Sequence, residues 1–394
     1  MSSTTSAPDQ AWSSEHRDEI RNLARQVAAD VYAPLAAELE SSGAAFPASE
    51  RRRLGDLGFL GIALPEQYGG AGAPLLDALV VIEELAKVCR PAAFQVFEAN
   101  TGPARAIELF GSDELKQRLL PAVVSGAATI AIAISEPDAG SAATDMKTSA
   151  RRDGDDFVVN GGKRWISNGG EADHYLLYAR MSDAPGARGI GALVVDGDTL
   201  GLTYGAPERL MGFRGIPSCD LNFDNARVPA ANLVVGPGGF KQLFGAFCIE
   251  RLGNATMSLA IGQAALDQTV RYVQERRQFG RDIVEFQAVQ LQLADMVMGV
   301  EAARQLIDAA ARQAGTGIPD ALQVSIAKCV ANEMGKRVSD LAMQLHGGNG
   351  YTEEYGMARL HRDAHGWAIA GGTPNIQRVR IVSELLGRSF GMRP

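Results

Sequence analysis

The spacing of hydrophobic and polar residues changes twice along the chain. From about residue 11 to 125, apolar residues recur every three or four positions in the stretches EIRNLARQVAADVYAPLAAELE, SERRRLGDLGFLG and LLDALVVIEELAKVC, which predicts helices. Turn-rich joints such as PEQYGGAGAP separate them. After PGGFKQLFGAF the helical spacing returns and continues to the C-terminus in long segments with few helix breakers. Both ends of the chain are therefore predicted to be helical.

Between the two helical regions lie short runs of β type, separated by Gly, Asp and Asn. They read ATIAIAIS, FVVNGGKRWISN, HYLLYARM, GIGALVVD, GLTYG and CDLNFDNARV. Helices, then strands, then helices, with no βαβ alternation, predict an α+β protein. We expect an N-terminal helical domain over 1–126, a middle β domain over 127–236 and a C-terminal helical bundle over 237–394. No GxGxxG follows a strand, which disfavours a Rossmann sheet.

Composition narrows the class of protein. Of the 394 residues, 46% are hydrophobic and 21% charged, as in folded globular proteins. The net charge of −8 and the absence of a Lys/Arg block argue against a nucleic-acid partner. Four scattered cysteines form no CxxC, which argues against zinc and a disulfide framework. The N-terminus lacks the apolar core of a signal peptide, and nowhere do 18 uncharged apolar residues run together. We expect a soluble protein of the cytoplasm, without membrane association.

One apolar helical stretch, AFCIERLGNATMSLAIGQAAL at 246–266, contains an acid and a base near its start. Helical spacing places Glu250 on one face with Phe247 and Asn254. Adjacent side chains point apart on a helix, so Glu250 and Arg251 each need their own partner or solvent. By itself, the pattern favours an ordinary Glu at the edge of a buried face. A catalytic carboxyl is the alternative.

Four other stretches combine residues that could bind a cofactor. The turn ISEPDAGSAATD at 134–145 could offer N–H groups and hydroxyls to a ring or an acyl carbonyl, or be a plain loop. In KRWISNGG at 163–170, Trp165 could stack on a ring or fill a core. ERRQFGRDIVEFQ at 275–287 suits a pyrophosphate and a base, or is a solvated helix end. The glycine break in QLHGGNGYTEEYGMARLHRD at 344–363 could precede a phosphate-binding helix start.

Two histidines, His361 and His365, are spaced as i and i+4, which suits a shared metal. No HExxH motif is present. We interpret them as surface or packing residues and expect no metal site.

Taken together and in this order, ISEPDAGS, KRWISN, RRQFGRDIVEFQ and QLHGGNGYTEEY with RLHRDA resemble the acyl-CoA dehydrogenase family. The resemblance extends from about residue 13 to 390. It implies an N-terminal helical domain, a middle β barrel and a C-terminal four-helix bundle. It also implies FAD, α,β-dehydrogenation of an acyl-CoA thioester in fatty acid or amino acid catabolism, and electron transfer to an electron-transfer flavoprotein.

The family pattern assigns cofactor contacts to residues of this chain. It implies that Ser135, Ser167 and Trp165 contact the flavin ring and that Ser141 lies near the thioester. A second set would hold the pyrophosphate and adenosine, several of them across a subunit interface: Arg276, Gln278, Phe279, Gln287, Gln344, Gly347, Gly348, Thr373 and Asn375. Contacts shared between subunits imply a homo-oligomer, and we expect a tetramer.

The chain departs from the commonest family pattern at the catalytic base. Many relatives carry a catalytic Glu in a YEGT-like stretch, whereas this chain reads IAGGTPNIQ with Gly371 in that place. A minority, including the isovaleryl-CoA and long-chain types, place the base on an earlier helix just before an Arg. The resemblance thus implies that Glu250 removes the α-proton, while Gly371 leaves room and supplies a backbone N–H. Further substrate contacts are expected from Phe94, Cys248, Arg251 and Arg380.

Three alternatives remain at this stage. The IAGGT and MGFRGIPS stretches resemble a desulfinase branch that performs a non-oxidative lyase reaction on the same scaffold, although Glu250 counts against it. A substrate bound to an acyl carrier protein could replace the CoA thioester. A non-catalytic helical interaction protein without flavin is disfavoured by the intact flavin motifs.

Overall fold

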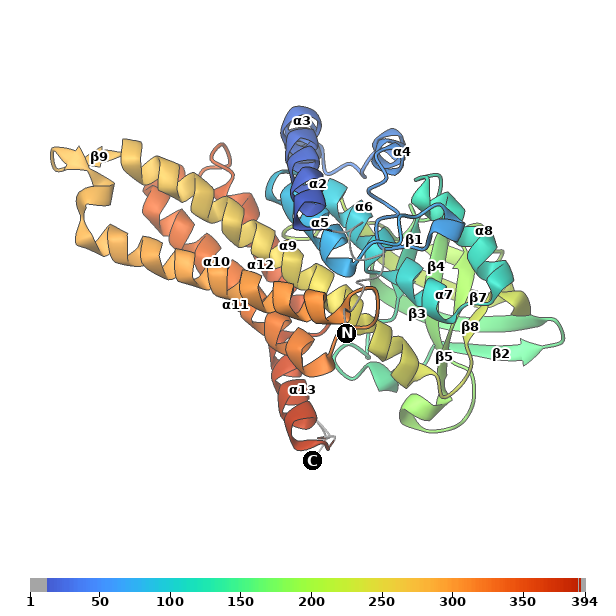
Figure 1. Cartoon of the computed structure of the whole chain (residues 1–394). Helices are drawn as coiled ribbons and strands as arrows, with labels where there is room; N and C mark the ends of the chain where they lie inside the picture. Colours follow the sequence, from blue (N-terminus) through green and yellow to red (C-terminus); the bar gives the residue numbers. More distant parts are fainter. Residues whose placement is uncertain (1–12, 389, 391–394) are drawn as a thin grey trace, which may run out of the picture.

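The computed structural model describes residues 13–388 and residue 390, and it has three parts in chain order (Figure 1). A helical part comes first, a β-sheet part follows, and a second helical part ends the chain. In Figure 1 the sheet and the long C-terminal helices extend to opposite sides, with the N-terminal helices across their junction. The α+β class predicted from hydrophobic spacing is confirmed.

The N-terminal part is helical. Its α-helices are α2 (Ser14–Val27), α3 (Ala33–Ser42), α4 (Ala48–Asp56), α5 (Leu75–Val88), α6 (Arg90–Asn100), α7 (Pro103–Phe110) and α8 (Asp113–Val124), with a π-helical turn between α2 and α3. Helix α5 is buried along most of its length because α2, α6 and α9 pack around it. Helix α8 begins after Ser112, whose hydroxyl accepts the Leu115 N–H, as in a typical N-cap.

The middle part is one eight-stranded sheet. Its strands are β1 (Ile130–Ala133), β2 (Ser149–Asp153), β3 (Asp156–Ser167), β4 (His174–Arg180), β5 (Ile190–Asp196), β6 (Leu202–Tyr204), β7 (Ser218–Pro229) and β8 (Leu233–Val235). The hydrogen-bonded order is β6-β7-β3-β2-β4-β5-β8, with β1 parallel to β4. All six β-type runs of the sequence form strands, and β2 and β8 are additional because they are short and polar or half-exposed.

The C-terminal part is dominated by long helices. They are α9 (Phe240–Glu275), α10 (Gln287–Ala314), α11 (Ala321–His346), α12 (Met357–Ile369) and α13 (Pro374–Leu386). A hairpin of β9 (Arg277–Gln278) and β10 (Arg281–Asp282) joins α9 to α10 at the far end of the bundle (Figure 1). Within the described residues, no helix is both long enough and apolar enough to cross a bilayer.

Helix α9 passes through the centre of the molecule. It packs against α10, α11 and α12 and also against α5, α6 and α7 of the N-terminal part. Residues 251–262 are buried without interruption, so this stretch is covered all round and not only on one face. Glu250 therefore stands at the start of a fully buried helical segment, not at the edge of an amphipathic one.

A buried ion pair joins the three parts. Asp363 of α12 accepts the Arg90 Nε–H from α6 at 2.5 Å and the backbone N–H of Phe213 from a loop of the β part at 2.8 Å. Both charged side chains are buried. The contact fixes how the helical parts and the sheet part meet.

Candidate active site

Glu250 and Gly371 lie against each other, although 121 residues separate them in the chain. A Cβ added at Gly371 would stand 2.8 Å from Oε2 and 3.0 Å from Oε1 of Glu250. Gly371 also has φ +65°, a conformation that glycine adopts without strain. Any residue with a Cβ at position 371 would therefore displace the Glu250 carboxyl.

The Glu250 carboxyl has a raised pKa. Burial is the largest cause, and the nearby cations Lys328 and Arg251 oppose it. Oε2 is buried and has no hydrogen-bond partner within the described chain. A buried carboxyl with a raised pKa and a free oxygen is suited to accept a proton from a bound molecule.

The backbone N–H of Gly371 is free within the part of the chain that the structure describes. The carbonyl of the preceding residue, Ala370, accepts hydrogen bonds from Lys328 Nζ at 2.9 Å and Asn254 Nδ2 at 3.3 Å. No described peptide bond is cis, so the N–H of the 370–371 peptide points away from these donors. The site thus combines a proton acceptor and an unpaired N–H donor.

Lys328 is a buried residue of the site that the sequence analysis missed. It stands on α11, fully shielded from solvent, and donates to Ala370 O, Gly372 O and Asn332 Oδ1. The available signal was a lysine at helical spacing from Val324 and Ala331 in VSIAKCVANEMG. A charged residue in an otherwise apolar stripe indicates a specific buried role.

The predicted substrate residues Arg251, Cys248 and Arg380 come together. Arg251 is buried, its Nε donates to Gly371 O at 3.3 Å, and its Nη1 has no partner in the described chain. Arg380 Nη2 donates to Cys248 Sγ at 3.5 Å. Burial, and then the proximity of Arg380, lower the pKa of Arg251. Two cations thus stand beside the Gly371 loop.

Two more ionisable groups lie near Glu250 and were not predicted as site residues. Glu98 of α6 has a pKa well above its usual value because of burial and the Glu250 charge. Tyr178 of β4 is buried, and its hydroxyl has no partner among the described residues. Burial and the Glu250 charge raise its pKa. They reach Glu250 from a helix and a strand far apart in sequence, which no local pattern signals.

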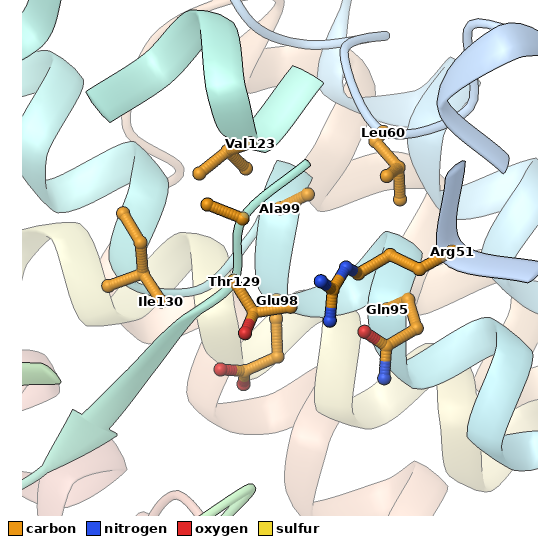
Figure 2. A pocket seen from close by; sticks show the side chains of 9 residues that line it. Arg51, Leu60, Gln95, Glu98, Ala99, Val123, Thr129 and Ile130 are labelled. Atoms are coloured by element: carbon orange, nitrogen blue, oxygen red, sulfur yellow. The ribbon is translucent and has the colours of Figure 1, made fainter. Parts of the chain in front are cut away.

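Glu98 also lines a small cavity between the N-terminal helices and β1. Figure 2 shows its side chain with those of Gln95 on the same helix, Arg51 of α4 and Thr129 just before β1. The cavity measures about 20 Å³, which is the space of about one water molecule. It is too small for an acyl group.

Phe94, predicted to contact substrate, packs into an aromatic cluster. Its ring lies 5.6 Å from that of Phe97 and 6.2 Å from that of Trp367 on α12. The ring of Phe213 also contacts Trp367, at 4.9 Å. The structure gives Phe94 a packing role, and its contact with substrate stays a prediction.

The predicted flavin-ring residues gather on the β part. The Ser135 carbonyl accepts the Arg164 N–H at 2.8 Å, which places Ser135 beside Trp165. The Trp165 indole is 51% exposed with φ +62°, and the Arg164 guanidinium covers one face at 4.4 Å. Ser167 pairs with Ser218 of β7, and Ser141 is exposed in the turn after β1. A half-exposed indole in a sparsely populated backbone conformation is typical of a ligand site.

The remaining predicted cofactor residues lie elsewhere in the single chain. Residues around the β9–β10 hairpin and the glycine break after α11 are exposed at the distal end of the bundle, away from the sheet (Figure 1); they are Arg276, Gln278, Phe279, Gln287, Gln344, Gly347 and Gly348. Thr373 caps α13 by accepting the Ile376 N–H, and Asn375 follows on its exposed side. Within one chain, the hairpin and the glycine break therefore lie away from the sheet that carries Trp165.

Three family models match the chain in sequence order. The N-terminal, middle and C-terminal domains of acyl-CoA dehydrogenase match residues 14–127, 131–226 and 237–386. A probable acyl-CoA dehydrogenase of Mycobacterium tuberculosis, FadE25, is 40% identical over 94% of this chain and 96% of its own length. A 3-sulfinopropanoyl-CoA desulfinase of Cupriavidus necator is 40% identical over 93% of this chain and 94% of its own.

Solved structures agree with these family matches. Butyryl-CoA dehydrogenase from Megasphaera elsdenii superimposes with a TM-score of 0.90 and 32% identity, covering 98% of this chain and 100% of that one. The three-part fold and these matches identify a flavoprotein oxidoreductase. The chain belongs to the acyl-CoA dehydrogenase family.

FAD is the cofactor of this family, and the residues present fit it. The exposed Trp165 indole beside Ser135 offers a flat apolar surface and polar neighbours to a flavin ring. The basic and aromatic hairpin offers guanidinium groups and an exposed ring to a pyrophosphate and a base. Bound FAD would supply a hydride acceptor.

Proposed function

We propose that this enzyme oxidises an acyl-CoA thioester to the trans-2-enoyl-CoA, with Glu250 as the base. The α-carbon loses a proton to Glu250, the β-carbon loses a hydride, and a double bond forms between the two carbons. Bound FAD would supply the hydride acceptor, and an electron-transfer flavoprotein would take up the two electrons. The chain's own residues bind the thioester, exclude water and accept the proton.

The observation that carries this proposal is the free Glu250 oxygen beside the free Gly371 N–H. Removing a proton next to a thioester builds negative charge on the carbonyl oxygen, which a preorganised N–H donor stabilises. The buried surroundings of Glu250 raise its pKa toward the range in which a carboxylate is an effective base. The reaction needs a proton acceptor and a donor to the carbonyl oxygen, and Glu250 and the Gly371 N–H are proposed for these two roles.

The same proposal includes a homotetramer with cofactor contacts shared between subunits. Within one chain the β9–β10 hairpin lies at the opposite end of the molecule from the sheet, whose strand β3 carries Trp165 (Figure 1). A second copy would supply the missing half of each site, as expected for an obligate oligomer.

The test is flavin reduction by wild type and Glu250→Gln. FAD-loaded protein is mixed anaerobically with straight, branched and polar acyl-CoA thioesters and with acyl-pantetheine-protein thioesters, while absorbance is followed at about 450 nm. We expect one thioester to bleach wild type and the Glu250→Gln variant to react at least ~100-fold more slowly. Glu301→Gln on the exposed side of α10 is the matched control. Equal rates in Glu250→Gln and wild type would refute Glu250 as the base.

A second function is favoured by the 40% identical desulfinase relative. In that reaction the C–S bond of a sulfinyl-acyl-CoA breaks, water supplies the proton to carbon and the oxygen to sulfite, and flavin undergoes no net reduction. Adding 3-sulfinopropanoyl-CoA to the panel and measuring sulfite decides between the two. Sulfite release without bleaching would replace the dehydrogenase proposal.

A further inference from the structure

The Lys328 ammonium is buried with all its hydrogen atoms in use. Its acceptors are Asn332 Oδ1 at 2.8 Å, Ala370 O at 2.9 Å and Gly372 O at 3.0 Å. Three N–H groups facing three oxygens match the protonated form. All three of these acceptors are uncharged, so the charge of Lys328 is balanced only at longer range, by Glu250. Such a cation is costly to bury and would be replaced by an apolar residue if it only filled space.

A polar network fixes the position of this ammonium between α9 and α11. Asn332 donates to Asn254 Oδ1 at 3.0 Å and to Ser258 Oγ at 2.8 Å. Its remaining amide oxygen is therefore the one that faces Lys328. Asn254 in turn donates to Ala370 O at 3.3 Å. The bundle thus presents a preset group of donors to the loop at 370–372.

This loop needs an external support. Gly371 and Gly372 have φ +65° and +93° and lack side chains that could anchor them. Lys328 holds the carbonyls on both sides of Gly371, and Arg251 holds the carbonyl of Gly371 itself. In a trans peptide the N–H points opposite to its carbonyl. The direction of the free Gly371 N–H is consequently set by the Lys328 contact with Ala370.

We infer that Lys328 is a positioning residue that holds the loop at 370–372, so that the Gly371 N–H meets the thioester carbonyl beside Glu250. The inference rests on the proposed dehydrogenation. Lys328 does not touch the reacting atoms, because its three N–H groups are already committed. It acts on catalysis through the loop and through its charge.

The charge of Lys328 also acts on the base. It lowers the pKa of Glu250 against the effect of burial. Burial lowers the pKa of Lys328 to about 7, and the Glu250 carboxylate opposes this shift. The charged and titratable groups around this pair come from five elements and are Arg251 and Cys248 on α9, Cys329 on α11, Glu98 on α6, Tyr178 on β4 and Arg380 on α13. Since only ionised Glu250 accepts a proton, the reaction rate rises as the pH passes upward through its pKa. Losing the cation moves this rise to higher pH.

The test compares Lys328→Met with wild type and with Lys336→Met, a control two turns further along α11. All three are prepared with FAD, and flavin reduction by the thioester that bleaches wild type is measured across pH and substrate concentration. We expect Lys328→Met to lower the maximal rate ~100-fold, as for loss of an oxyanion donor. We also expect the acidic limb of the pH–rate profile, where the rate rises with pH, to move to higher pH. Lys336→Met should match wild type in both.

A merely structural role would change yield or melting temperature but leave the acidic limb where wild type has it, and that result would overturn the inference. If Lys328→Met does not fold, Asn332→Ala removes one of the three acceptors and should shift rate and limb in the same direction by less. An unchanged rate and limb in that variant also overturns the inference. Failure of wild type to bleach with any thioester would instead count against the proposed function.

Discussion

At the scale of single residues, the candidate site depends on the Glu250 carboxyl, which faces a glycine, Gly371, in place of a side chain. Two cations near Glu250 are fixed by other groups. Lys328 donates to Asn332 Oδ1, and Arg251 donates to Gly371 O. Oε2 of Glu250 is a buried group without a hydrogen-bond partner in the described chain, which folding alone does not favour. Such unpaired groups persist where a ligand completes them.

Replacing Gly371 by Ala tests this arrangement. The new Cβ would stand 2.8 Å from Oε2 of Glu250 and would force a side chain into φ +65°. We expect roughly 1 kcal/mol of lost stability from the backbone and, in addition, flavin reduction slowed at least ~10-fold because the base or its donor must shift. Anaerobic reduction kinetics and denaturant unfolding measure the two effects.

Gly387→Ala is the matched control for this substitution. Gly387 has φ +61° and open space around its Cβ position. It should lose similar stability and keep the wild-type rate. Equal rates in both variants would show that Glu250 does not need the space at residue 371.

At the scale of elements, the parts of the molecule are joined by specific polar contacts at several places. The contact of Asp363 on α12 with Arg90 on α6 and the Phe213 N–H is one of them. It connects the helix that leads into the Gly371 loop with the N-terminal part and the sheet part. Its loss should therefore weaken the whole assembly and not one helix.

The Asp363→Ala variant should be much less stable than wild type. It leaves the buried Arg90 guanidinium and a backbone N–H without their acceptor, which costs about 3–5 kcal/mol. Denaturant unfolding measures this loss. Asp295→Ala removes the exposed ion pair between Asp295 on α10 and Arg337 on α11. This variant should lose at most about 1 kcal/mol of stability. Similar losses in both variants would contradict the structural role of Asp363.

At the scale of the whole molecule, the chain exposes groups that a single copy leaves without a partner. Phe279, at the tip of the hairpin, is 92% exposed, and the predicted flavin-ring residues lie on the opposite side of the molecule (Figure 1). An aromatic ring held at the end of a basic hairpin is expected to bind the cofactor of a neighbouring subunit.

Phe279→Ser tests shared cofactor binding. We expect lower FAD content per chain and a smaller assembly in solution, because the cofactor and the subunit contacts stabilise each other. Absorbance ratios and mass measurement in solution give the two quantities. Leu200→Ser is the control, since Leu200 is also 92% exposed but lies on the β part. Full FAD content and unchanged mass in Phe279→Ser would exclude a role for the hairpin in either.

Much of the architecture could be predicted from local patterns. Helical spacing in the first and last regions and the six β-type runs, including FVVNGGKRWISN and HYLLYARM, became the helices and strands of the structure. The motifs also identified the family, and the pairing of Glu250 with a glycine at 371 singled out the contact that the structure shows. Short-range spacing reports burial of one face, which is a property of each segment alone.

The surroundings of Glu250 were decided only by tertiary structure. Lys328 meets Ala370 and Gly372 across more than 40 residues of chain, and Glu98 and Tyr178 reach Glu250 from a helix and a strand of other parts. Each of these side chains looks ordinary in its own segment. Their function arises from packing that brings distant segments together in a dry interior, where a charge acts over longer distances than in water. The sequence by itself determined the segments and the family, and the fold determined which groups act on one carboxyl.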